Sequence, residues 1–207
     1  FLGTYEPTKS EQNMGMSKGP KGGFVLANEA GTGKTYVLGG SIKEILEAES
    51  ETKVIYVTTN TQLVGQVKED FKNLKVKNKP IADSVLFATY SGMSKYGEEQ
   101  SEDTTPPNEN LQEIFDVISG DARVLLILDE PDSNPGSIKR LHAPPGQVSR
   151  GQIFQRIMGD IRANERNSMI VFSSATVFKN PGDARYLAPS GIFGEPKVYQ
   201  SDDGNIN

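Results

Sequence analysis

The sequence predicts an α/β fold in which a mainly parallel sheet of five or more strands carries helices on both faces. Two observations predict it. Short apolar runs alternate with longer amphipathic stretches along most of the chain, and the most apolar run, residues 124–128, shows no inside–outside alternation. Alternating strands and helices favour a parallel sheet, and an uninterrupted apolar strand is typical of one buried on both faces.

Each element is expected from its own local pattern. Strands are expected where short runs are rich in β-branched and aromatic residues, at 23–27, 54–57, 84–88, 124–128 and 169–172. Helices are expected where apolar residues recur every three or four positions, at 34–49, 61–74, 111–118 and 150–164.

The remaining segments read as connections. We expect a lead-in over residues 1–21, one domain over 22–195 and a tail over 196–207. Within the domain, residues 97–110 are acidic and lack apolar side chains, which predicts a solvated loop. Residues 131–147 are rich in proline and predict a second long loop.

Composition excludes several classes of protein. The 207 residues contain no cysteine and a single histidine, His142, so thiolate sites and histidine metal clusters are excluded. Without a membrane-length apolar run or a signal peptide, an intracellular protein, cytoplasmic or nuclear, with no membrane partner is expected. The net charge of −5 disfavours a broad nucleic-acid surface but not a few contacts by amides and hydroxyls. The chain begins with Phe1 rather than methionine, so we expect a fragment or a processed piece.

A Gly-rich turn between the first expected strand and helix fits the phosphate-binding pattern G-x-x-x-x-G-K-[ST], except that Asn28 replaces the first glycine. The two later glycines let backbone amides converge on phosphate oxygens. Lys34 is expected to reach the β and γ phosphates, and the Thr35 hydroxyl to coordinate Mg²⁺. The predicted binding residues for ATP are Asn28, Glu29, Ala30, Gly31, Thr32, Gly33, Lys34 and Thr35.

Asp129 and Glu130 end the most apolar strand. An aspartate there can hold Mg²⁺, and the adjacent glutamate can orient or deprotonate an attacking water. We therefore expect Thr35 and Asp129 as metal ligands, and Lys34 and Glu130 as catalytic residues. The alternative is a strand that simply ends in polar residues. The Gly-Lys-Thr motif earlier in the chain favours the functional interpretation, because two adjacent carboxylates would otherwise have no cation beside them.

Small hydroxyl residues end the fifth expected strand. At that edge they can hydrogen-bond the segment of Asp129 and Glu130 and sense the γ-phosphate, although a serine-rich strand end is as common without such a role. The predicted coupling residues are Ser174, Ala175 and Thr176.

Two further groups of hydroxyls and amides follow the second and third strands. Such groups at helix starts suit phosphodiester oxygens, but they are equally ordinary caps. The nucleic-acid candidates are Thr59, Asn60, Gln62, Thr89, Tyr90 and Ser91. Five nearby lysines, at 68, 72, 75, 77 and 79, are expected to form a solvated face.

In their order and spacing these four motifs resemble the first RecA-like domain of superfamily 2 helicases, and more closely the strawberry-notch-like group. The segments 87–91 and 191–195, Phe-Ala-Thr-Tyr-Ser and Gly-Ile-Phe-Gly-Glu, are the more discriminating ones. The resemblance spans about residues 22–195. It implies a RecA-like P-loop NTPase that uses ATP and Mg²⁺ and acts on nucleic acid, with DNA expected rather than RNA.

The sequence departs from that family pattern in two ways. Pro131 and Asp132 follow the Asp-Glu pair where the family usually has a small residue and a histidine, which puts in doubt the coupling to Ser174–Thr176. The chain also has room for one RecA-like domain, whereas the resemblance implies a second one that supplies an arginine finger. Arg185 is the nearby arginine in this chain, and we expect it not to reach the site.

Three functions remain open from the sequence. The leading one is the ATP-binding half of a nucleic-acid-dependent ATPase, helicase or translocase, hydrolysing ATP when a second RecA-like domain completes the site. The alternative is a nucleotide-binding module with a structural or assembly role and little turnover. An ATPase that acts on protein is the third.

Overall fold

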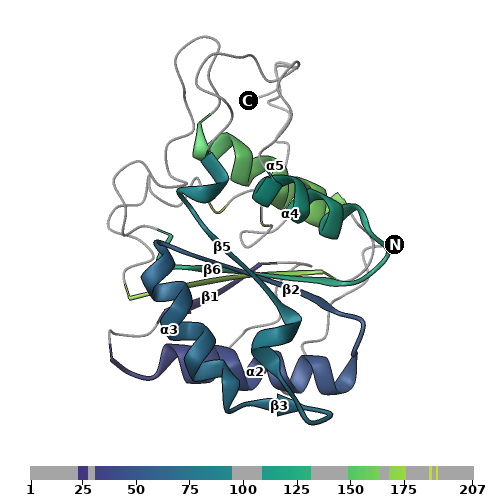
Figure 1. The fold of residues 1–207 in the computed structure, drawn as a ribbon. Helices are drawn as coiled ribbons and strands as arrows, with labels where there is room; N and C mark the ends of the chain where they lie inside the picture. The colour runs from purple at the N-terminus through teal and green to yellow at the C-terminus, as the bar shows by residue number, and fades with distance from the viewer. Residues whose placement is uncertain are drawn as a thin grey trace, which may run out of the picture.

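The computed structural model describes residues 23–27, 31–94, 109–131, 149–163, 168–175, 187 and 190. Its centre is a five-stranded sheet whose hydrogen-bonded neighbours are all parallel, in the order β1-β7-β6-β2-β5 (Figure 1). The strands are β1 (Gly23–Ala27), β2 (Lys53–Thr58), β5 (Val85–Thr89), β6 (Val124–Asp129) and β7 (Met169–Ser174). The predicted α/β fold with a parallel sheet is confirmed.

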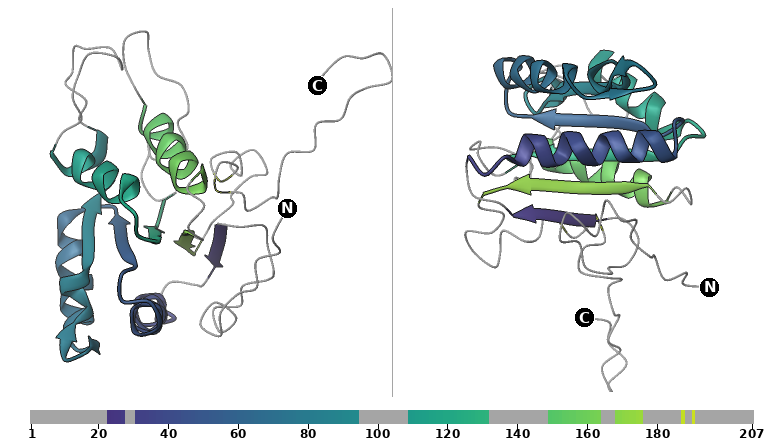
Figure 2. Two further views of the ribbon diagram at one scale, coloured as in Figure 1. Left: turned by 90° about the vertical axis from the view of Figure 1, so that its right-hand side faces the viewer. Right: turned by 90° about the horizontal axis from the view of Figure 1, so that it is seen from below.

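Helices cover both faces of the sheet, as predicted (Figures 1 and 2). On one face lie α2 (Lys34–Ala48) and α3 (Thr61–Lys72), and on the other α4 (Glu109–Ser119) and α5 (Arg150–Ala163). The acidic loop was predicted to run to residue 110, but Glu109 and Asn110 form the first turn of α4. An acidic residue in the first turn of a helix is stabilised by the helix dipole. The acidic composition of this segment is therefore compatible with a helix start as well as with a loop.

A small hairpin after α3 was not predicted. It consists of β3 (Lys75–Val76) and β4 (Lys79–Pro80), joined by Lys77 and Asn78 at positive φ. Two short 3₁₀ turns, η1 (Ile81–Ser84) and η2 (Gly92–Ser94), flank β5. The five lysines predicted to form a solvated face are all exposed.

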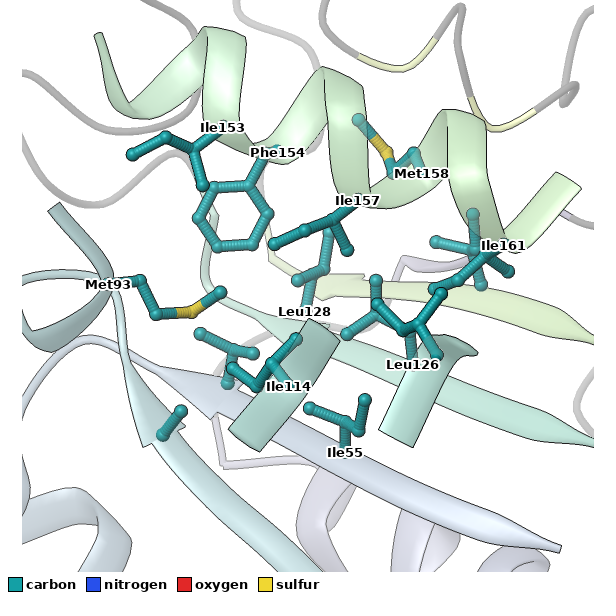
Figure 3. Packing of buried hydrophobic residues seen from close by; sticks show 14 of the residues in the cluster. Ile55, Met93, Ile114, Leu126, Leu128, Ile153, Phe154, Ile157, Met158 and Ile161 are labelled. Atoms are coloured by element: carbon teal, nitrogen blue, oxygen red, sulfur yellow. The ribbon is translucent and has the colours of Figure 1, made fainter. Parts of the chain in front are cut away.

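Two apolar cores lie on opposite faces of the sheet. One is formed by α2 and α3 against the sheet, and the other by α4 and α5, whose side chains meet those of the strands in Figure 3. The residues of β6 from Val124 to Leu128 are at most 2% exposed, so the central strand is buried on both faces. This burial explains the uninterrupted apolar run in the sequence.

The strand order brings distant segments together. Because all five strands are parallel, their carboxyl ends share one edge of the sheet, where ligands bind in such folds. β7 lies between β1 and β6, so the turn after β1, the end of β7 and the end of β6 are neighbours.

The predicted lead-in and tail, the loop beyond Pro131 and Arg185 lie outside the described residues. The described helices include none with the length and apolar character that a membrane crossing requires.

Candidate active site

The turn that leads into α2 depends on two glycines. Gly31 and Gly33 have φ of 77° and 82°, and Gly33 is the N-cap of α2. A Cβ at either position would meet nothing within 4 Å, so glycine is required there for its backbone conformation and not for space. The turn places Lys34 and Thr35 at the start of α2, where the helix dipole favours an anion. Asn28, Glu29 and Ala30 lie outside the described residues.

The Lys34 side chain joins the two predicted motifs. Its Nζ donates a hydrogen bond to Glu130 Oε1 over 2.7 Å, across 96 positions of sequence. The two side chains are 12% and 29% exposed, so the ion pair is partly shielded from water. The pair holds the lysine and the carboxylate at one end of the sheet.

Glu130 is fixed by several contacts. Its backbone has φ 48°, a left-handed conformation that costs a non-glycine residue about 1–3 kcal/mol and persists only where the surroundings impose it. Its N–H donates to the carbonyl oxygen of Ser173 over 2.7 Å. The Ser174 hydroxyl donates to Glu130 Oε2 over 3.1 Å. The hydrogen bond expected between the end of the fifth strand and the Asp-Glu segment is therefore present; Ala175 is exposed and Thr176 is outside the described residues.

Asp129 lies one residue earlier, at the last position of β6. The Thr58 hydroxyl donates to its Oδ2 over 3.4 Å, and the Tyr90 hydroxyl to its carbonyl oxygen over 3.0 Å. Burial raises the pKa of the Asp129 carboxyl above its ordinary value, an effect that the neighbouring hydroxyls of Ser173 and Tyr56 oppose.

Two buried hydroxyls beside Asp129 bear on metal binding. Tyr56 Oη and Ser173 Oγ make no hydrogen bond of standard geometry within the described part of the chain, although both influence the pKa of Asp129. Buried hydroxyls of this kind suit the ordered waters of a hydrated cation. No cluster of three or more acidic or histidine ligands occurs among the described residues. This donor set fits Mg²⁺, which commonly uses one or two carboxylates and completes its shell with waters and substrate phosphates.

The nucleic-acid candidates fall into two groups at this edge. Asn60 caps α3, with its Oδ1 accepting from the Leu63 N–H over 2.9 Å, so the ordinary cap is observed. Asn60 and Gln62 are exposed and Thr59 is half-buried. In the second group, the hydroxyls of Thr89 and Ser91 lie 3.3 Å apart. Tyr90 is 0% exposed, so its side chain belongs to the core and is not available for contact with a nucleic-acid strand.

Sequence reasoning missed Tyr56 and the partnership of Thr58 with Asp129. The sequence carries no signal for this contact, because it depends on the register of the parallel ladder, in which Val57 pairs with Leu128 and the next residues are Thr58 and Asp129. Tyr56 lies two residues before Thr58 and so shares its face of the sheet.

A family model described as P-loop containing NTP hydrolase pore-1 matches residues 4–207. No curated protein matches this chain. Among solved structures, the Sulfolobus solfataricus SWI2/SNF2 ATPase core in complex with dsDNA is 13% identical, with a TM-score of 0.51, and the match covers 85% of this chain and 32% of that one. The Pyrococcus furiosus Hef helicase domain is 15% identical, with a TM-score of 0.50, covering 83% of this chain and 34% of that one.

At these identities the two structures establish a shared fold. The chain spans about a third of the length of each.

Proposed function

This chain belongs to the family of P-loop containing NTP hydrolases whose model it matches, and on that premise we propose that it is the ATP-binding half of a nucleic-acid-dependent ATPase, helicase or translocase. The observation that carries the proposal is the contact of Lys34 with Glu130, bordered by Ser174. It joins a phosphate-binding lysine to a carboxylate that can act on water.

Each residue has a role in this proposal. The turn over residues 28–35 binds the phosphates, and Lys34 contacts the β and γ phosphates. Thr35 and Asp129 would hold Mg²⁺, which would neutralise charge on the phosphates. An anionic γ-phosphate competes with Glu130 for the Lys34 ammonium. Once released, the Glu130 carboxylate orients or deprotonates the attacking water.

A second RecA-like domain completes the site in this proposal. Lys34 and a Mg²⁺ held by Thr35 and Asp129 would supply positive charge from this domain alone, whereas phosphoryl transfer needs positive charge from more than one side. An arginine finger from another domain is worth about 10³–10⁵ in rate in related enzymes. The motif order supports assignment to superfamily 2, and within it to the strawberry-notch-like group. The domain boundaries proposed are 22–195, with the lead-in and tail outside them.

Nucleic acid, DNA rather than RNA, is the proposed partner. One of the two solved structures carries dsDNA, and the exposed side chains Asn60, Gln62 and Ser91 lie after the carboxyl ends of β2 and β5. Amides and hydroxyls suffice to contact a phosphodiester backbone without a basic surface.

A structural or assembly role with little turnover is the second candidate. The observation that favours it is Pro131 and Asp132 directly after Glu130, where the family that the motifs resemble usually has a small residue or cysteine and then a histidine. Turnover by the intact protein decides between the two.

The test measures ATP hydrolysis by the full-length protein and by residues 1–207, with and without single-stranded DNA or RNA. We expect strand-stimulated hydrolysis by the full-length protein and very slow hydrolysis by residues 1–207. Lys34→Ala, in calorimetry, is expected to remove measurable ATP binding. Equal ATP affinity in wild type and Lys34→Ala would refute the proposed phosphate site, and robust strand-stimulated turnover by residues 1–207 would refute the need for a second domain.

A further inference from the structure

Tyr90 makes a contact with the site that the proposed function does not use. Its hydroxyl donates a hydrogen bond of 3.0 Å to the carbonyl oxygen of Asp129. The residue follows β5, 39 positions away in sequence, and its side chain is fully buried. A buried tyrosine hydroxyl that donates a hydrogen bond to one backbone carbonyl oxygen helps to fix the orientation of that peptide group.

The peptide group concerned connects the two acidic residues. The Asp129 carbonyl oxygen and the Glu130 N–H belong to the same planar unit. Tyr90 holds the oxygen on one side, and the Ser173 carbonyl oxygen accepts from the N–H over 2.7 Å on the other. The plane is therefore held from both ends.

The orientation of this peptide determines where the Glu130 side chain lies. Glu130 has φ 48°, and φ describes rotation about the bond that follows the peptide nitrogen. A left-handed conformation at glutamate persists only where the surroundings impose it. Releasing the Asp129 oxygen allows the plane to rotate and moves the carboxylate away from Lys34 and Ser174.

Tyr90 is itself rigidly placed. Its N–H donates to the Thr58 carbonyl oxygen over 3.0 Å, and its ring packs against Phe154 of α5 with centroids 5.5 Å apart. Figure 3 shows Phe154 in the apolar core between α5 and the sheet. The following turn is closed by Gly92, whose N–H donates to the Thr89 hydroxyl over 3.0 Å.

We propose that Tyr90 is a positioning residue for Glu130, holding the peptide between Asp129 and Glu130 so that the carboxylate is aligned for hydrolysis. The proposal rests on the proposed function, in which Glu130 acts on the attacking water. Because the Tyr90 side chain is fully buried and its hydroxyl bonds to a backbone carbonyl oxygen, its effect is expected on the rate of hydrolysis and not on nucleotide affinity.

The experiment compares Tyr90→Phe with a matched control, Ser168→Ala, in the full-length protein. Tyr90→Phe removes the hydroxyl and keeps the ring against Phe154. Ser168→Ala also removes a side-chain bond to the backbone of β6, since Ser168 Oγ accepts from the Val124 N–H over 3.0 Å, but at the opposite end of that strand. Three quantities are measured: the dissociation constant of ATP, the single-turnover hydrolysis rate, and the amide hydrogen exchange of residues 125–130 without nucleotide.

Tyr90→Phe is expected to slow single-turnover hydrolysis about 10- to 100-fold, the range that misplacement of a reacting group by up to 1 Å produces. ATP affinity is expected to stay within about twofold of wild type, and exchange at the Glu130 amide to accelerate. Ser168→Ala is expected to leave the hydrolysis rate near that of wild type.

Unchanged hydrolysis and exchange in Tyr90→Phe would overturn the positioning role while leaving the proposed function intact. Equal slowing by both substitutions, or a loss of ATP affinity that accounts for the slowing in Tyr90→Phe, would also overturn it, because the effect would then be general loosening. A wild-type protein that binds ATP and never hydrolyses it would overturn both proposals together.

Discussion

At the end of β6 the acidic residues are half-buried among hydrogen-bonding partners, whereas Gly31 and Thr32 in the turn before α2 are exposed. Asp129 and Glu130 receive hydrogen bonds from Thr58, Tyr90 and Ser174, and the Glu130 N–H donates to Ser173. Gly31 and Thr32 are exposed, and the two glycines have open space where a side chain would begin. In the proposed function, the half of the site that acts on water is therefore preorganised, and the half that receives phosphate is accessible.

The difference matches the demands of the two tasks. A group that acts on a water molecule must be held at a defined distance from it, so a rigid position favours a high rate of hydrolysis. Backbone amides that wrap a phosphate need room for the ligand to enter. The Lys34 ion pair with Glu130 spans both halves, and substitutions on either side of it test the comparison.

The largest effect is expected from Glu130→Gln in the full-length protein. The amide keeps the shape and loses the base, so hydrolysis is expected to fall by about 10²–10⁴ while ATP still binds. Nucleotide affinity is expected to rise modestly, because Lys34 no longer has a carboxylate partner that competes with phosphate. Single-turnover hydrolysis and calorimetry measure the two quantities. Hydrolysis at the wild-type rate in Glu130→Gln would assign this residue to the structure instead.

Asp129→Asn tests whether the buried Asp129 carboxylate lowers the stability of the folded protein. Burial raises the pKa of Asp129, so an ionised carboxylate there destabilises the folded state at neutral pH. We expect the amide to stabilise the nucleotide-free protein by about 1 kcal/mol, within the range of other stabilising substitutions at functional sites, and to remove Mg²⁺-dependent hydrolysis.

The pH dependence of that gain follows from the direction of the shift. Above the raised folded pKa the carboxyl is ionised in both states and the gain is complete. As the pH falls from the folded pKa toward the ordinary carboxyl value, the folded carboxyl takes up a proton and the gain shrinks. Denaturant unfolding at several pH values measures it. A gain that persists undiminished below the ordinary carboxyl pKa would contradict a charge effect.

A smaller effect, on the free energy of unfolding, is expected at Gly33, where the backbone conformation alone requires glycine. Gly33→Ala keeps open space around the new methyl group but places alanine at φ 82°, so we expect a loss of about 1–2 kcal/mol from left-handed strain. Gly40→Ala is the matched control, because Gly40 lies inside α2, also has open space and has no positive φ. There alanine is expected to stabilise by up to about 1 kcal/mol.

Thermal or chemical unfolding of the two glycine variants measures both values. Opposite signs are the expected result. A loss of stability at both positions would contradict an effect of backbone conformation, because Gly40 has no positive φ.

The sequence by itself predicted the five strands of the main sheet and the four helices that cover it, although not the hairpin of β3 and β4. The strands and helices depend on local apolar periodicity, and Gly33-Lys34-Thr35 depends on a turn only a few residues long. Asp129 and Glu130 could be placed at a strand end because the apolar run before them stops there. These features are local, so neighbouring residues are enough to specify them.

The tertiary structure decided which of those residues meet. Lys34 reaches Glu130 across 96 positions, and Ser174 reaches it because β7 lies between β1 and β6. Tyr90 was predicted as a nucleic-acid candidate beside Thr89 and Ser91. In the structure its ring packs on Phe154 and is buried, and its hydroxyl donates to the carbonyl oxygen of Asp129. Strand order and register are set by the burial of whole faces of the sheet, a long-range balance that no short stretch of sequence contains.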